Sequence, residues 1–172
     1  RLYLNNNLVV YNLYVRPRDF SPSRKELYVR NLATRETKLI ASSVESSLHY
    51  LAAQNNVIFF QNISGYLGKG TSSILSYDLS TGKTTNIVQF PFGSAFMSGN
   101  QVLYDYSVNN ADNVGVYDLD KNITKLVSPP DFGYVMDFKD GKILYASRAS
   151  GSRGSPYYIY DTNTGNYFTV KE

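Results

Sequence analysis

The chain has 172 residues, a net charge of +3, one histidine and no cysteine. This length is enough for one domain with a hydrophobic core, and the absence of any run near ~18 apolar residues excludes a transmembrane helix. Without cysteine there is no disulfide scaffold or thiolate metal site, and a single histidine excludes a multi-histidine metal site.

Eight hairpin patterns follow one another along the chain. Each has two short runs rich in Tyr, Phe, Val, Ile or Leu on either side of a polar turn cluster, which is the signature of paired strands. The patterns span residues 2–11, 26–40, 48–60, 74–88, 95–104, 114–127, 134–145 and 157–170. No segment of about ten residues or more has a clean helical period, so we predict essentially no helix.

Every second hairpin places an Asn or Asp directly before its turn. These residues are Asn31, Asp78, Asp118 and Asp161, at spacings of 47, 40 and 43 residues. An Asx side chain at this position accepts hydrogen bonds from backbone amides two residues further on. We therefore interpret these side chains as turn caps and not as catalytic groups.

Pairs of hairpins combine into four-stranded units that repeat at ~43 residues, a period typical of β-propeller blades. We predict an all-β fold, a β-propeller with four four-stranded antiparallel blades in one domain, residues 1–172. Residues 2–4 are placed beside the last blade, where they would close the ring and remove an exposed edge. The blades are then approximately residues 5–51, 52–97, 98–138 and 139–172 plus 1–4. The alternative is half of a larger ring, completed by a second copy or by further sequence.

Three turn segments carry a family resemblance: Tyr77-Asp78-Leu79-Ser80-Thr81-Gly82-Lys83, Tyr117-Asp118-Leu119-Asp120-Lys121 and Tyr160-Asp161-Thr162-Asn163-Thr164-Gly165. They resemble the repeats of TolB-type, WD40-like propellers and of the propellers attached to prolyl-oligopeptidase-type enzymes. The first copy departs from this pattern, because it has Arg30-Asn31 and no Gly in its turn. The Gly-His and Trp-Asp pairs of true WD40 repeats are absent. The resemblance implies a domain that binds proteins, peptides or glycans, among which the fold alone does not choose.

Two catalytic look-alikes lack the context that they need. Gly82-Lys83-Thr84 matches the end of a phosphate-binding loop, but it lies in a hairpin turn and not at a strand-to-helix junction. Asp118-x-Asp120-x-Asn122 imitates the start of a calcium loop, with Ile123 where Gly is required and Pro129 where Glu is required. We predict no metal and no cofactor.

The single histidine, His49, lies in a predicted strand and has no Gly-x-Ser-x-Gly nucleophile motif to serve. It is expected to face a central channel or to pack between blades. Among the carboxylates, Asp105 and Asp137 lie inside predicted strands and are the candidates to check for a raised pKa. We predict that the protein is not an enzyme and has no catalytic residue.

Positive charge gathers in the connections between the second and third strands of each unit, which we expect to be long loops on one face. They span residues 16–25, 62–72, 107–113 and 148–155, with seven cations against two anions, a charge of +5. Aromatic residues in loops of the same face are expected to be too exposed for the core, among them Phe90. The predicted binding residues are Arg16, Arg18, Phe20, Arg24, Lys25, Tyr66, Lys69, Phe92, Phe132, Arg148 and Arg153. Arginine and aromatic side chains together are typical of binding hot spots.

We expect a non-catalytic binding or assembly module whose cationic face meets an anionic glycan or an acidic protein. One alternative is a structural subunit of a cell-surface layer, an appendage or a virion. Another is an enzyme-associated gating propeller, with His49 and Asp105 or Asp137 in one pocket. Nucleic acid is not expected, because there is no recognition helix and no aromatic series to stack bases. Abundant Asn, Ser, Thr and Tyr and the start at Arg1 predict a processed extracellular or cell-surface protein, and homo-oligomerisation stays open.

Overall fold

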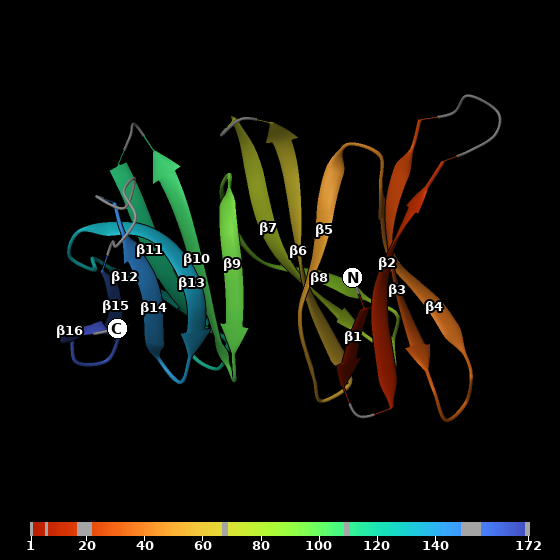
Figure 1. The fold of residues 1–172 in the computed structure, drawn as a ribbon. Helices are drawn as coiled ribbons and strands as arrows, with labels where there is room; N and C mark the ends of the chain where they lie inside the picture. The colour runs from red at the N-terminus through yellow and green to blue at the C-terminus, as the bar shows by residue number, and fades with distance from the viewer. Residues whose placement is uncertain are drawn as a thin grey trace. The chain divides into compact units, whose positions relative to one another are not determined.

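The computed structural model describes residues 2–5, 7–16, 22–66, 69–108, 111–148 and 156–170. Every regular element in these ranges is a β-strand (Figure 1). The strands form four four-stranded antiparallel sheets, which confirms the predicted all-β fold. Among these same residues there is no helix of the length and apolar character that a membrane span requires.

The first compact unit, Arg1–Phe92, contains two sheets. The first sheet consists of β1 (Leu2–Asn5), β2 (Leu8–Val15), β3 (Arg24–Asn31) and β4 (Thr37–Ser43). The second consists of β5 (Ser46–Gln54), β6 (Val57–Tyr66), β7 (Lys69–Asp78) and β8 (Thr84–Pro91). Side chains with period two, such as Val10, Leu27 and Val29, place one face of the first sheet against Ile58 and Phe60 of the second. These residues form the core of the unit.

The second compact unit, Gly93–Glu172, repeats this plan. Its first sheet consists of β9 (Gly93–Ser98), β10 (Gln101–Val108), β11 (Ala111–Asp118) and β12 (Ile123–Val127). Its other sheet consists of β13 (Phe132–Lys139), β14 (Lys142–Ser147), β15 (Tyr157–Asp161) and β16 (Tyr167–Val170). Its core joins Leu103, Val114 and Val116 to Ile143 and Tyr145, all buried.

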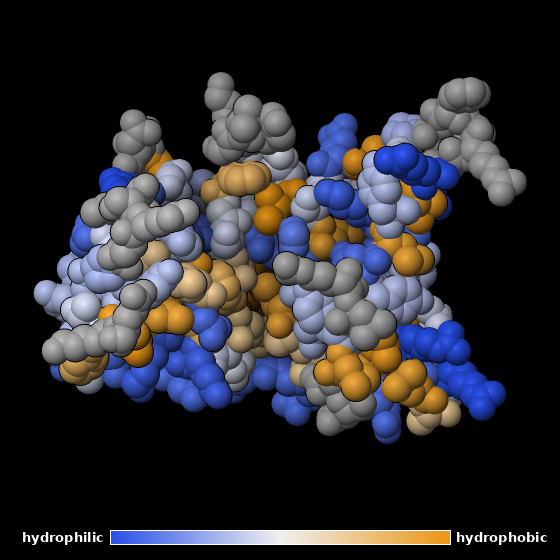
Figure 2. Space-filling view, viewed as in Figure 1, coloured by the Kyte–Doolittle hydropathy of each residue, from blue (hydrophilic) through white to orange (hydrophobic). Residues whose placement is uncertain are grey.

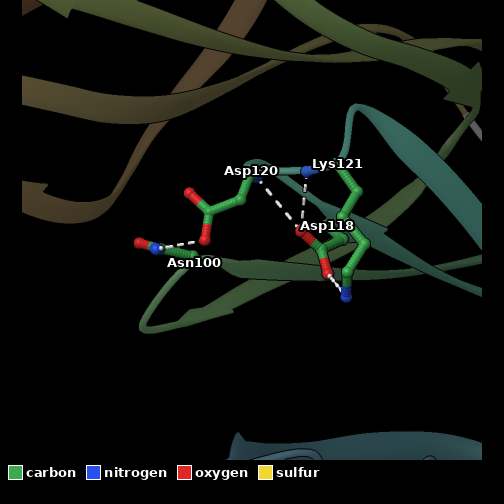
Figure 3. A network of polar contacts seen from close by, with 4 residues as sticks. All are labelled: Asn100, Asp118, Asp120 and Lys121. Carbon is green, nitrogen blue, oxygen red and sulfur yellow. Dashed lines mark hydrogen bonds and ion pairs between the residues drawn. The ribbon is translucent and has the colours of Figure 1, made fainter.

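The four predicted turn caps are confirmed. In Asn31, Asp78, Asp118 and Asp161, Oδ1 accepts the backbone N–H groups two and three residues further on, at 2.7–3.2 Å. Figure 3 shows the Asp118 turn, where the other carboxylate oxygen also accepts Lys121 Nζ at 2.8 Å. Asp120 is engaged by Asn100 Nδ2 at 2.8 Å in the same view. The look-alike calcium loop is thus a capped hairpin turn.

The Asp161 cap gives a testable prediction. The N–H groups of Asn163 and Thr164, assisted by nearby lysines, hold the pKa of Asp161 below its ordinary value. The ionised cap therefore stabilises the fold above the unfolded pKa near ~3.9, and this contribution is lost as the pH falls through the lower folded pKa. We expect Asp161→Ala to lower the melting temperature at pH 7, and the difference from the wild type to narrow in acid.

Asp161→Asn is the matched control, because the native Asn31 caps its turn with the same amide oxygen. This variant should melt near the wild type at neutral pH. Thermal scans by circular dichroism at several pH values measure both effects. An equal loss in the Ala and Asn variants would show that the negative charge, and not the capping oxygen, stabilises the turn.

The placement of residues 2–4 in the last blade is wrong. β1 pairs with β2, in the register Leu2↔Tyr11 to Asn5↔Leu8, and the fourth sheet has four strands of its own. The predicted blade boundaries therefore shift, and the sheets span residues 2–43, 46–91, 93–127 and 132–170. The reason is local. A strand joined to its neighbour by a short turn loses little loop-closure entropy on pairing, whereas pairing with the far end of the chain loses more.

Two of the predicted long loops are also wrong. Most of residues 62–72 extends β6 and β7, which pair from Val57↔Asp78 as far as Tyr66↔Lys69. Likewise β10 reaches Val108 and β11 begins at Ala111. Gly and Ser are frequent in turns, so the sequence of residues 62–72 predicts a loop. Positive φ at Gly65 and Gly70 lets the strands continue through this glycine-rich stretch.

Candidate functional site

A basic cavity of about 400 Å³ lies in the first unit, between the first and second sheets. It is lined from the first sheet by Tyr3, Asn12, Leu13, Tyr14 and Lys25, and from the second by Ser47, Leu48 and His49. Aromatic and apolar groups make its walls, and a lysine, an imidazole, a hydroxyl and an amide supply the polar atoms. A concave apolar site with a few convergent polar groups is the usual form of a binding site.

Hydrogen bonds fix the strands that build this basic cavity. Tyr14 on β2 pairs with Lys25 on β3, so their side chains share one face of the first sheet. Asn12 Nδ2 donates to the carbonyl oxygen of Leu48 at 2.8 Å and ties β2 to β5. Lys25 Nζ donates to Ser47 Oγ at 2.7 Å across the same gap. The polar groups are therefore held in place by both sheets.

The electrostatic environment of the basic cavity is positive. The Arg16 guanidinium carbon lies 5.4 Å from the centre of the Tyr14 ring, in a cation–π arrangement. Hydrogen bonds from Ser23 and Arg16, and the charges of Arg16 and Lys25, lower the pKa of Tyr14. None of the described residues that line the cavity carries a carboxylate. The arrangement suits an anionic group, which Lys25 and Arg16 would bind by charge-assisted hydrogen bonds.

The structure brings together two of the predicted binding residues, Arg16 and Lys25, at the basic cavity. Lys25 lines the cavity and Arg16 lies over its Tyr14 wall. Arg24 is engaged elsewhere, because its Nε lies 2.5 Å from Oε1 of the buried Glu26. The hydrogen bonds from Arg24 and Tyr28 lower the pKa of Glu26, so the ion pair offsets the charge of Arg24. Arg16 and Lys25 therefore carry the positive charge of this site.

The other predicted binding residues do not join the basic cavity. Phe92 is half-buried at the end of the first unit, and Phe132 packs on the second unit's core, 5.6 Å from the ring of Tyr145. Arg148 forms an ion pair with Asp112. Phe90 is 5% exposed, so its placement among exposed loop aromatics is wrong. Arg18, Phe20 and Arg153 lie outside the described residues, as do the side chains of Tyr66 and Lys69.

Sequence reasoning missed most of the walls of the basic cavity. Tyr3, Asn12 and Ser47 lie in strands without any motif, and only folding brings them together. Tyr14 did carry a signal, because it lies two residues before Arg16, and residues two apart in a strand share a face. His49 is in β5 as expected and is exposed at the cavity.

Asp105 and Asp137, which the gating alternative places in one pocket with His49, belong to the second unit, whereas His49 belongs to the first. Burial raises the pKa of Asp105, against the opposing effect of the N–H groups of Ser94 and Val135. Asp137 Oδ1 accepts the N–H of Phe138 at 2.8 Å. Within the described residues no group of three or more His, Asp or Glu side chains is arranged to hold a metal ion.

The fold of the chain is shared with solved structures, although no family model and no curated protein matches it. One such structure is the β-propeller domain of the Trilobed protease from Pyrococcus furiosus, described as having an open velcro topology. It has a TM-score of 0.72 and 15% identity over 100% of this chain and 56% of that one. TolB from Acinetobacter baumannii has a TM-score of 0.61 and 20% identity, over 86% of this chain and 38% of that one.

The four sheets are β-propeller blades. This confirms the resemblance to TolB-type and peptidase-associated propellers at the level of the fold. A third structure, oligogalacturonate lyase in complex with manganese, has a TM-score of 0.70 and 13% identity over 96% of this chain. It is covered over 50% of its length, so this propeller chain spans less than two thirds of each of the three structures.

Proposed function

We propose that this β-propeller chain is a non-catalytic binding module whose basic cavity holds an anionic group of a glycan or of an acidic protein. The observation that supports the proposal is that Lys25 lines the cavity and Arg16 lies over the ring of Tyr14, while the described lining residues carry no carboxylate. Tyrosine walls suit the stacking of a sugar ring or an aromatic side chain. The expected location is extracellular or at a cell surface.

Removal of the two charges tests the proposal. A charge-assisted hydrogen bond contributes about 1.5–3 kcal/mol. A variant with Arg16→Gln and Lys25→Gln loses two of them, so it should bind roughly a hundredfold to ten-thousandfold more weakly. Heparin is the probe for an anionic glycan, polyglutamate is the probe for an acidic protein, and dextran is the neutral comparison. Titration calorimetry at low salt and at high salt measures the affinity, which should fall with salt.

The matched control removes the same two charges from turns. Arg35 and Lys83 are exposed in the β3–β4 and β7–β8 turns, and Arg35→Gln with Lys83→Gln changes the net charge equally. This control should bind either anionic probe as the wild type does. An equal loss in the control would assign the binding to general charge, and no loss in either double variant would refute the site.

A second candidate function is a gating propeller attached to a hydrolase. It is favoured by one observation: an acylaminoacyl peptidase matches 100% of this chain with a TM-score of 0.72 and 14% identity, over 32% of its own length. Protein purified from its natural source would then carry peptidase activity on a chromogenic peptide. A pure binding module would carry none.

A further inference from the structure

A second concave site lies in the first unit, at the ends of the strands where the short turns are. Two adjoining cavities, of about 320 Å³ and about 230 Å³, share Leu8, Asn31 and Asn56 in their linings. We name them together the amide cavity. Figure 2 shows hydrophilic side chains, in blue, beside apolar ones, in orange, at the lower end of this unit. The basic cavity is a different site, because residues 12–14 and Lys25 line it at the other ends of β2 and β3.

Side-chain carboxamides are the main polar groups of the amide cavity. The lining residues that carry one are Asn7, Asn31, Gln54, Asn55 and Asn56. They come from the β1–β2 turn, the end of β3 and the β5–β6 turn, so only folding brings them together. Each carboxamide offers two donor hydrogens and an acceptor oxygen. The cavity therefore suits ligand groups that both donate and accept hydrogen bonds.

Three of these carboxamides are not used inside the described part of the chain. No hydrogen bond to another described residue engages the side chains of Asn7, Asn55 or Asn56. Their turns are held by the backbone instead. The carbonyl oxygen of Asn7 accepts the N–H of Leu32 at 2.7 Å, and that of Asn56 accepts the N–H of Leu79 at 2.9 Å. The backbone is thus fixed while the amide groups stay accessible.

The third sheet uses the same turn position differently. Asn100 corresponds to Asn56, because its carbonyl oxygen accepts the N–H of Leu119 at 2.9 Å, as Asn56 does with Leu79. The side chain of Asn100 is engaged within the chain, since its Nδ2 donates to the carboxylate of Asp120 at 2.8 Å (Figure 3). A carboxylate two residues after the turn cap therefore occupies the amide at this position.

Neither sheet of the first unit has a carboxylate at that place. In the second sheet the residue is Ser80, whose hydroxyl donates to the Asp78 cap at 2.5 Å. In the first sheet the residue is Ala33, which has no polar side chain. The carboxamides of Asn7 and Asn56 are therefore open to a ligand, whereas that of Asn100 is not.

The rest of the lining is neutral in sum. Among the described lining residues Lys38 is the one cation and Glu36 the one anion, and Nζ of the first lies 3.6 Å from Oε1 of the second. Leu8, Val29 and Leu79 add apolar groups. The ligand that fits is uncharged, with polar groups for the carboxamides and C–H surface for the apolar side chains.

We propose that the amide cavity binds a neutral saccharide of one or two rings. Saccharide hydroxyl groups donate and accept hydrogen bonds as carboxamides do, and the ring C–H groups fit the apolar part of the lining. The cavity volumes are at the small end of the range for ligand sites. A peptide bound through its main chain would require donors and acceptors in a row along a strand edge, whereas these carboxamides converge from separate turns.

Titration of the 172-residue chain with maltose, cellobiose and lactose tests the proposal. At least one of these sugars should shift the side-chain NH2 signals of Asn55 and Asn56 in NMR spectra. A variant with Asn55→Gly and Asn56→Gly loses two neutral hydrogen bonds and should bind that sugar roughly fivefold to a hundredfold more weakly. Glycine keeps the turn, because both positions have positive φ and the corresponding turns of the third and fourth sheets have Gly99 and Gly141 there.

Two further variants test the reason for the binding. Ser80→Asp keeps the Asn56 amide but supplies a carboxylate like that of Asp120, so it should also weaken binding of the sugar. Asn100→Gly is the matched control, because it removes an amide that is already engaged, and it should bind as the wild type does. The double variant of Arg16 and Lys25 should also bind the sugar normally, at low and at high salt, which separates this site from the basic cavity.

Three results would overturn the proposal. The NH2 signals would stay unchanged with all three disaccharides if no neutral saccharide binds. An equal loss of binding in the Asn100→Gly control would place the sugar elsewhere. Shifts produced by a blocked alanine tripeptide, and by none of the sugars, would assign the amide cavity to a peptide main chain.

Discussion

Replacing Tyr145 with alanine is expected to lower the free energy of unfolding of the second unit by about 3–5 kcal/mol. The Tyr145 side chain is fully buried, and its ring stacks on Tyr158 at 5.4 Å and lies 5.6 Å from Phe132. Its hydroxyl donates to the carbonyl oxygen of Pro130 at 2.8 Å. Alanine would leave a cavity between two sheets and an unsatisfied carbonyl group. Urea denaturation followed by circular dichroism measures the change.

Tyr145→Phe separates the ring from the hydroxyl. It keeps the packing and removes one hydrogen bond, so it should lower the free energy of unfolding by about 0.5–1.5 kcal/mol. Burial raises the pKa of Tyr145 to about 12, so the folded state keeps the phenolic proton longer than the unfolded chain. The stability due to this group is therefore lost as the pH rises above ~10, and the difference between Tyr145→Phe and the wild type should shrink there. Equal losses in the Ala and Phe variants would contradict the packing argument.

Gly93→Ala is expected to destabilise the second unit by about 1–3 kcal/mol, the usual range for overpacking. A Cβ atom at Gly93 would overlap the backbone carbonyl oxygen of Asp105 on the paired strand β10. A backbone atom cannot rotate away as a flexible side chain can, so the start of β9 must shift. Chemical denaturation measures the loss, and weakened protection of the β9 amides in hydrogen exchange would locate it.

The control for Gly93 is a glycine in the turn at the other end of β9. Gly99 has a φ of 53° and no neighbouring atom within 4 Å of a Cβ at that position. Asparagine tolerates this left-handed conformation, as Asn55 and Asn56 do in the corresponding turn of the second sheet. Gly99→Asn should therefore change the stability by about 0.5 kcal/mol or less. If it matches Gly93→Ala, the loss of glycine and not the steric overlap is responsible.

The turns could be predicted from the sequence because their chemistry is local. Asn31, Asp78, Asp118 and Asp161 bond to amides two and three residues away, so residue type and spacing are sufficient. The four-stranded unit follows from these turns and the alternating runs between them. The prediction for residues 2–4 is wrong, because it follows from the general avoidance of exposed strand edges. Pairing with the adjacent strand costs less loop-closure entropy than pairing with the far end of the chain.

Long-range contacts limited the prediction of the basic cavity. Arg16 and Lys25 were predicted from charge alone, and the structure places both at the site. The ion pair of Arg24 with Glu26 was visible in principle, because residues two apart in a strand share a face. The ion pair of Arg148 with Asp112 was not, because 36 residues separate them in sequence. The predicted loop charge of +5 counts both arginines as able to bind a ligand. In the folded chain each of them forms an ion pair with a carboxylate.

Each strand pairs only with strands adjacent to it in the chain, and this has a consequence for biosynthesis. All four strands of the first sheet are present once residue 43 has left the ribosome, and their pairing requires no later strand, although the apolar face of the sheet is covered only by the second sheet. Contacts with small sequence separation also form quickly. The polypeptide can therefore pair the strands of its blades one blade after another during translation.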